Sequence, residues 1–151
     1  MAFVTDPIGI AGEQEAAKML EKKGFKLIEH NWRMGHLEVD LIAEGNKEMV
    51  FAEVKARTTT FGDVRPEEFV DERKKQRMIA AANAFIKYRK TDKTPRFDII
   101  GVLVHPETLE ITYRCHLENA FYPSNRTMNT GSLNGQWKWR HRGRTIGSKK
   151  R

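Results

Sequence analysis

The sequence predicts an α/β domain in which a mixed β-sheet is flanked by helices, in the order α-β-β-β-α-β-β. Two segments, residues 10–23 and about 71–90, repeat apolar residues at helical spacing. Five shorter segments alternate or concentrate apolar residues as strands do. Because helices and strands interleave along the chain, a sheet covered by helices is the arrangement that buries both kinds of apolar surface.

One such domain accounts for most of the length. A chain of 151 residues, 39% of them apolar, is long enough for one domain with a core and too short for two of ordinary size. We expect this domain to span residues 1–123. A basic, flexible tail is expected at residues 124–151, where Ser, Asn, Thr, Gly and basic residues dominate.

The first helix carries an isolated acid on its core-facing side. We expect the helix over residues 10–23, with Gly24 as its C-terminal stop. Glu13 lies at helical spacing from three apolar residues, Ala16, Ala17 and Leu20. A buried carboxylate is costly unless it is paired, protonated or bound to a metal. A capping or arginine-paired acid and a metal-site acid therefore both stay open.

Three strands are expected next, over residues 25–30, 37–43 and 49–56. The turn-forming residues 44–47 join the second and third strands into a hairpin, and residues 57–66 read as a loop.

The hairpin carries acids and a lysine that can act together. Strand alternation places Glu38 with Asp40 on one face of its first strand, and Glu53 with Lys55 on one face of its second. Carboxylates that converge at the end of a sheet can bind Mg²⁺, and a lysine beside that ion can act on a phosphate. A polar pair on a half-buried strand is ordinarily only the wet side of a sheet, so this pattern alone is weak.

The second helix is expected from Glu67 or Asp71 to Lys90. Lys74 and Lys75 lie at the edges of its apolar stripe, where a basic group can reach a phosphate held over the sheet. A lysine that only snorkels to solvent is the commoner case.

Two further strands complete the sheet. Residues 96–104 are almost fully apolar, which fits a strand buried on both faces, and residues 109–117 alternate cleanly. Asp98 is the exception in the first of these strands; local pairing with Arg96 would account for it, and no chemistry is assigned to it.

The net charge of +7 is concentrated in the tail. Residues 137–151 hold seven of the 27 basic residues and no acid. This composition suits a polyanion partner, and Trp139 beside Arg140 and Arg142 can stack on unpaired bases. A solvated tail that binds nothing in particular stays open as the alternative.

Other features exclude several classes of protein. The single cysteine, Cys115, cannot form an internal disulfide, and no apolar run approaches the roughly 20 residues that span a membrane. No signal peptide is evident, so a reducing cytoplasm is the expected compartment and no membrane partner is expected. The five histidines lack zinc-ligand spacing and read as ordinary surface or strand residues. There is no glycine-rich phosphate loop and no serine nucleophile elbow.

Taken together, these motifs resemble a known family. The matching stretches are GEQEAAKMLEKKGFKLIEHNWRMGHLEVDLIAEGNKEMVFAEVKAR, then FG, then VDERKKQRMIAAANAFI and RFDII, within residues 9–122. They resemble the YraN-type family of predicted endonucleases, in the PD-(D/E)xK nuclease superfamily. One departure is that Leu37 stands before Glu38-Val39-Asp40 where that family usually has glycine, and Gly35 lies two residues earlier.

The resemblance implies a restriction-endonuclease-like core and a metal-dependent DNA endonuclease. By this resemblance Asp40 and Glu53 would hold Mg²⁺ or Mn²⁺, Glu13 would orient water or help hold a second ion, and Lys55 would act on the attacking water and the phosphate. Lys74 would contact DNA phosphates, and Arg57, just past the strand that carries Glu53 and Lys55, is a candidate for the same role. The tail residues lie outside the resemblance, so Trp139, Arg140 and Arg142 rest on composition alone.

The substrate is expected to be DNA, with branched, single-stranded or other repair and recombination intermediates as candidates. The likeness to archaeal Holliday-junction resolvases is one of fold only, which does not identify a substrate. A non-catalytic nucleic-acid-binding module with the same fold is the alternative function, and a protein-interaction scaffold is a third. Whether the protein acts as a monomer or as a homodimer is left open.

Overall fold

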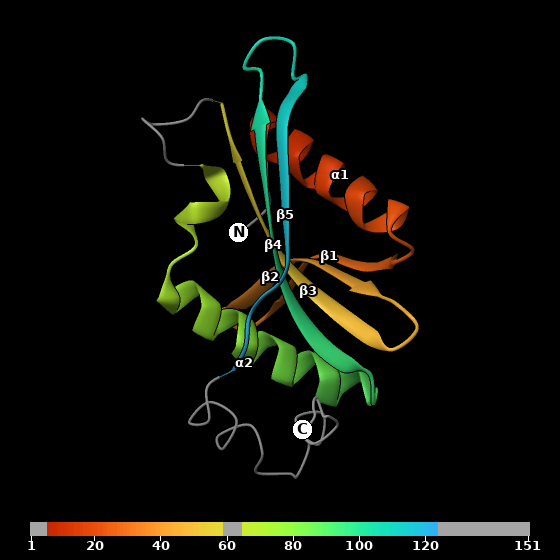
Figure 1. Cartoon of the computed structure of the whole chain (residues 1–151). Helices are drawn as coiled ribbons and strands as arrows, with labels where there is room; N and C mark the ends of the chain where they lie inside the picture. The colour runs from red at the N-terminus through yellow and green to blue at the C-terminus, as the bar shows by residue number, and fades with distance from the viewer. Residues whose placement is uncertain (1–5, 59–64, 124–151) are drawn as a thin grey trace.

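The computed structural model describes residues 6–58 and 65–123. Five strands form one mixed sheet in the spatial order β1-β2-β3-β4-β5, in which only β3 and β4 run parallel (Figure 1). The elements are α1 (Pro7–Lys22), β1 (Lys26–Met34), β2 (Leu37–Glu44), β3 (Glu48–Arg57), the 3-10 helix η1 (Pro66–Phe69), α2 (Glu72–Arg89), β4 (Thr94–Val104) and β5 (Ile111–Phe121). The predicted α/β class and element order are confirmed.

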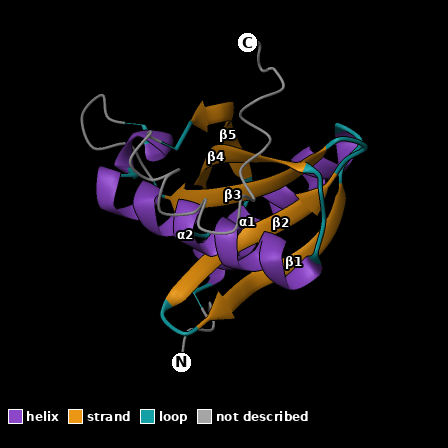
Figure 2. Ribbon diagram, turned by 90° about the horizontal axis from the view of Figure 1, so that it is seen from below, coloured by secondary structure: helices purple, strands orange, loops and turns teal. Residues whose placement is uncertain are grey.

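The two helices cover opposite faces of the sheet (Figure 1, Figure 2). Ala16 and Leu20 of α1 pack on one face, in a core whose other buried residues are Leu41, Ala43, Val50, Ala52, Val54, Ile100, Val102 and Val104. Met78 and Phe85 of α2 pack on the other face, where Phe51 lies 5.8 Å from Phe85 between ring centroids. The crossover from β3 through α2 to the parallel strand β4 thus places α2 over the face that carries Glu53 and Lys55.

Element ends differ from the predicted ones where local backbone geometry decides them. Helix α1 begins at Pro7 rather than at residue 10, because the Asp6 side chain accepts the N–H groups of Ile8 and Gly9 and caps the helix. Strand β5 begins at Ile111 rather than at residue 109, since Leu109 has a φ of 63° and belongs to the turn.

Strands β1 and β3 are longer than predicted. Strand β1 continues past residue 30 to Met34 through Asn31, whose φ is 52°. The turn into β2 follows at Gly35, with a φ of 63°, so the shifted glycine noted in the sequence serves this hairpin. Strand β3 includes Arg57, which was expected in a loop.

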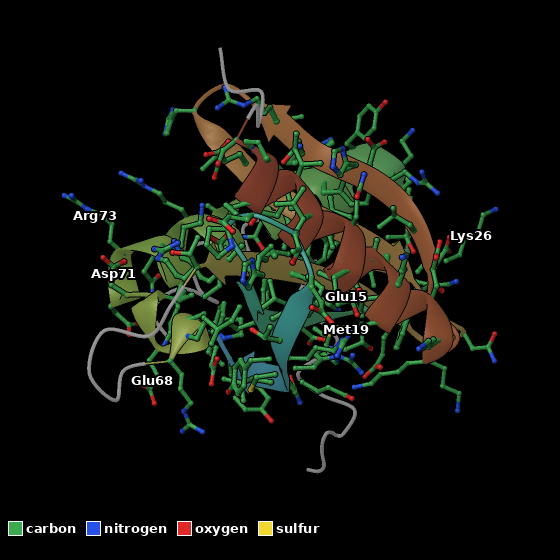
Figure 3. All side chains as sticks on the ribbon, turned by 90° about the horizontal axis from the view of Figure 1, so that it is seen from above. Glu15, Met19, Lys26, Glu68, Asp71 and Arg73 are labelled. Carbon is green, nitrogen blue, oxygen red and sulfur yellow. The ribbon has the colours of Figure 1, made fainter. Side chains whose placement is uncertain are left out.

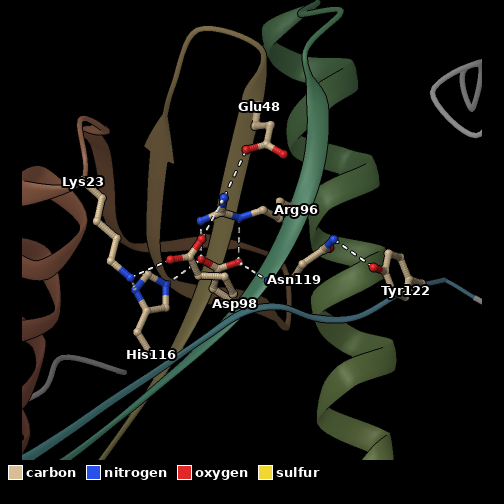
Figure 4. A network of polar contacts seen from close by, with 8 residues as sticks. Lys23, Glu48, Arg96, Asp98, His116, Asn119 and Tyr122 are labelled. Atoms are coloured by element: carbon tan, nitrogen blue, oxygen red, sulfur yellow. Dashed lines mark hydrogen bonds and ion pairs between the residues drawn. The ribbon is translucent and has the colours of Figure 1, made fainter. Parts of the chain in front are cut away.

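Buried Asp98 is the centre of a polar network that joins β4, β5 and Lys23, the C-cap residue of α1 (Figure 4). Arg96 donates from Nε and Nη2 to its two carboxylate oxygens at 2.9 and 2.7 Å, and the Asn119 N–H donates at 3.0 Å. His116 Nε2 lies 2.7 Å from Asp98 Oδ2, while Lys23 Nζ lies 2.9 Å from His116 Nδ1. Because Lys23 can only donate, Nε2 carries the imidazole proton and donates it to Asp98. The predicted pairing of Asp98 with Arg96 is confirmed, within a larger network.

The closest approach of α1 to the sheet occurs at Gly12. A Cβ at this position would lie 2.5 Å from Ala56 Cβ and 3.0 Å from Val102 Cγ2. Gly12→Ala is therefore expected to destabilise the fold by up to about 2 kcal/mol, since overpacking costs about 1–3 kcal/mol and the better helix propensity of alanine offsets about 1 kcal/mol of that cost. Urea unfolding measures the change. Gln14→Ala, on the exposed side of the same helix, should change stability by under about 0.5 kcal/mol.

Candidate metal centre

The candidate site begins where strands β2 and β3 separate. Their ladder runs from Glu44↔Met49 to Leu41↔Ala52 and then stops. At the next position the Val54 N–H donates to Asp40 Oδ2 at 2.8 Å instead of to a strand carbonyl. The Asp40 carboxylate therefore points toward β3.

Glu53 lies beside Asp40 on the face of the sheet covered by α2. Its residue exposure is 4%, and within the described part of the chain its buried Oε1 has no hydrogen-bond partner. Lys74 Nζ from α2 lies 3.4 Å from Oε1, outside hydrogen-bonding geometry, and Lys55 Nζ lies 3.7 Å from Oε2. Two ammonium groups thus provide charge for this carboxylate without satisfying both of its oxygens.

The pKa values of both acids are raised above their usual range. Burial and the charge of Asp40 raise the pKa of Glu53 to about 8, although Lys74 and Lys55 oppose this shift. Burial also raises the pKa of Asp40 above its usual range, and the Val54 N–H and Lys74 oppose that shift. Without a further positive charge, the pair therefore retains a proton at neutral pH.

Glu13 approaches from the opposite layer, on α1. Its residue exposure is 7%, and burial together with the charge of Asp40 raises its pKa. His30 Nε2 lies 3.1 Å from Glu13 Oε1, and the Asn31 amide donates to the same oxygen at 3.4 Å. The expected alternatives of an N-terminal cap and a buried arginine partner are not what is found, because its partners are His30 and Asn31.

The donor set fits a hard divalent cation. Asp40 and Glu53 supply carboxylate oxygens, of which Glu53 Oε1 is buried and without a hydrogen-bond partner among residues 6–58 and 65–123. Over the same ranges, no three His, Cys, Asp or Glu side chains form a ready-made metal cluster. Two carboxylates with open positions for water suit Mg²⁺ or Mn²⁺, which are bound through few protein oxygens, better than Zn²⁺.

Three basic residues were predicted to act at this site, and two of them, Lys55 and Lys74, lie next to Glu53. Lys55 and Lys74 both contact Glu53, and each side chain is about a quarter exposed, at 25% and 23%. Arg57 lies farther along β3 and donates from Nη1 to the Ala56 carbonyl at 2.9 Å. Arg73, by contrast, extends outward from the first turn of α2 (Figure 3). Lys74, rather than Arg73, is thus the basic residue of α2 that lies next to Glu53.

Some site-adjacent groups were not anticipated from the sequence. His30 and Asn31 both contact Glu13. The sequence indicated only that they lie at the end of the predicted strand over residues 25–30. Glu67 from η1 is buried over Gly101, accepts the Tyr113 hydroxyl at 2.9 Å, and has one oxygen without a hydrogen-bond partner among the described residues. Glu38, which the sequence placed on the same strand face as Asp40, forms an exposed ion pair with Arg33 at 2.9 Å.

Three residues predicted to bind nucleic acid, Trp139, Arg140 and Arg142, lie outside the described residues. The part of the chain that the structure describes contains no helix long and apolar enough to cross a membrane.

Comparison with known proteins places the chain in a family. The profile described as Uncharacterised protein family UPF0102 matches residues 12–102, a range that contains Glu13, Asp40, Glu53 and Lys55. A UPF0102 protein of Bacteroides thetaiotaomicron is 40% identical over 116 residues, covering 77% of this chain and 93% of that protein. One of Phocaeicola vulgatus is 40% identical over 118 residues, covering 76% and 92%. One of Caldanaerobacter subterraneus subsp. tengcongensis is 41% identical over 116 residues, covering 76% and 93%. The chain thus belongs to the UPF0102, or YraN, family, within the PD-(D/E)xK nuclease-like superfamily.

Proposed function

We propose that this protein is a metal-dependent DNA endonuclease that hydrolyses phosphodiester bonds. The observation that carries the proposal is Glu53, a buried carboxylate with an oxygen that has no hydrogen-bond partner among the described residues, beside Asp40 and two lysines. Burying two adjacent carboxylates costs stability, and that cost is accounted for if they hold a cation. DNA intermediates of repair or recombination are the proposed substrates.

Asp40 and Glu53 would hold Mg²⁺ or Mn²⁺, with the Val54 carbonyl as a further oxygen ligand. When bound, such an ion lowers the pKa of water and stabilises the leaving oxygen of a phosphate ester. The acids would be ionised in that state, since the added positive charge replaces the proton that the pair otherwise retains.

The remaining groups serve the phosphate and the attacking water. Lys55, on the same strand face as Glu53, would orient the attacking water and offset negative charge that develops on the phosphate oxygens. Lys74 would leave Glu53 for a phosphate oxygen once a metal ion supplies the balancing charge. Glu13, near enough for the charge of Asp40 to act on it, would orient water on the other side of the site.

Cleavage assays test the proposal. Linear, single-stranded and branched DNA are each incubated with Mg²⁺, with Mn²⁺ or with chelator. Metal-dependent cleavage is expected in the unmodified protein, abolished in Asp40→Asn and reduced by about 10²–10³-fold in Lys55→Ala, while both variants still bind DNA. Two matched controls should cleave normally: Glu44→Gln at the far end of β2, and Lys26→Ala on the exposed start of β1.

The outcome also separates the alternative function. A protein that binds all three DNAs but cleaves none of them with either metal would be a non-catalytic nucleic-acid-binding module. A protein without salt-sensitive DNA binding would be neither an endonuclease nor a nucleic-acid-binding module. Contacts to DNA phosphates release counterions, so they make the binding affinity depend on salt concentration.

A further inference from the structure

Strand β1 has an unusual backbone conformation opposite the metal centre. Asn31 has a φ of 52°, in the left-handed region that non-glycine residues rarely adopt. The pairs on either side are His30↔Leu41 and Trp32↔Val39, so Asn31 lies across from Asp40. A left-handed residue inside a strand costs of order 1 kcal/mol or more, and asparagine tolerates it better than most residues.

This conformation sends two neighbouring side chains to one acid. The Asn31 amide donates to Glu13 Oε1 at 3.4 Å, and His30 Nε2 lies 3.1 Å from the same oxygen. Successive residues of a regular strand point to opposite faces, so His30 and Asn31 could not both reach Glu13 without the left-handed residue. Both contacts are made to Glu13 Oε1.

We propose that Asn31, assisted by His30, is a positioning residue that holds the Glu13 carboxylate in place as the third anionic group of the Asp40–Glu53 centre. This inference rests on the proposed function, since it concerns the same metal site. It assigns the strained residue of β1 a task that packing alone does not explain: Asn31 carries a donor from the edge strand to an acid on α1.

Mn²⁺ affinity, measured by titration calorimetry, tests the inference without requiring cleavage. Asn31→Gly keeps the left-handed backbone accessible and removes only the amide. It is expected to weaken Mn²⁺ binding about tenfold, as outer-shell partners of metal ligands commonly do. His30→Ala should weaken it as well, whereas His30→Gln, which retains a donor, should restore part of the loss.

Two comparisons separate positioning from a general structural effect. Asn119→Gly changes the same residue type at the same kind of backbone conformation, a φ of 55°, on strand β5, and should leave Mn²⁺ affinity unchanged. In a Glu13→Gln background, Asn31→Gly should cause no further loss, because its effect passes through Glu13. Thermal unfolding verifies that each variant folds.

The possible outcomes are distinct. Unchanged Mn²⁺ affinity in Asn31→Gly, with binding by the unmodified protein intact, would overturn the positioning role and leave the proposed function standing. An equal loss from Asn31→Gly in the Glu13→Gln background would overturn it too. Failure of the unmodified protein to bind Mn²⁺ at all would overturn the proposed function, and this inference with it.

Discussion

Asp98→Ala is expected to lower the free energy of unfolding by about 3–5 kcal/mol, the usual cost of removing one partner from a buried ion pair. Asp98 is fully buried, and the Arg96 side chain that it pairs with is 9% exposed. Without the carboxylate, the guanidinium of Arg96, the His116 Nε2–H and the Asn119 N–H all lose an acceptor. Urea unfolding at pH 7 measures the loss.

The same network predicts a pH dependence. Burial disfavours ionised Asp98, but the hydrogen bonds from His116, Arg96 and the Asn119 N–H outweigh it, and the pKa of Asp98 is lowered. An acid with a lowered pKa in the folded state stabilises the protein above its unfolded pKa, near 3.8, and loses this contribution as pH falls through the folded value. The difference in stability between the unmodified protein and Asp98→Ala should therefore shrink in acid.

An exposed ion pair at the edge of this network provides the control. Its acid, Glu118, also places Oε1 3.5 Å from Arg96 Nη1. Lys23 and Glu118 are 2.6 Å apart, with side chains 41% and 43% exposed. Glu118→Gln should cost under about 1 kcal/mol, as exposed pairs do. A comparable cost for Glu118→Gln and Asp98→Ala would show that burial does not govern the energetics of this network.

The order of helices and strands could be read from the sequence because it depends on periodicity. The apolar stripe of α2 and the continuous apolar run of β4 each have one plausible structure, and both are found. The ends of the elements depend on single side chains and backbone angles instead. Asp6 as a helix cap and Asn31 as a left-handed strand residue are compatible with several local structures, so pattern alone could not identify them.

The candidate site shows the same division. Strand alternation places Glu53 and Lys55 on one face, and the structure brings Asp40 and Lys74 to them. The contact between Glu13 and β1 could not be predicted, because it depends on how α1 crosses the sheet. That crossing is set by the close approach at Gly12, a tertiary feature with no signature in the local sequence.

Glu53→Gln is expected to remove the pH dependence of stability that Glu53 imposes on the metal-free protein. The folded state raises the pKa of Glu53 from 4.5 to about 8, so between these values it retains a proton that the unfolded chain releases. Stability therefore falls as pH rises through this window. Glutamine does not titrate, so the variant should lack this decline and be the more stable protein at pH 8.5 in chelator.

A bound metal ion should stabilise the unmodified protein and have little effect on Glu53→Gln. Mg²⁺ or Mn²⁺ requires ionised Glu53, so the rise in melting temperature on adding metal to the unmodified protein should grow between pH 6 and pH 8.5 as the competing proton is lost. Glu53→Gln should show almost no such rise and no metal-dependent DNA cleavage. The variant would gain stability at high pH and lose function, as expected when a carboxylate is buried for a cation rather than for the fold.

Glu44→Gln is the matched control. Glu44 lies on the adjacent strand β2, and its pKa is lowered in the folded state, whereas that of Glu53 is raised. A hydrogen bond from Lys93, at 2.6 Å, holds the pKa of Glu44 below its usual range. The Glu44 side chain is 28% exposed. Its substitution should slightly reduce stability at neutral pH and leave the metal response intact. If Glu53→Gln instead lost stability at pH 8.5, the lysines beside Glu53 would already hold it ionised. The site would then be a lysine-paired carboxylate with no deficit of positive charge for a metal ion to supply.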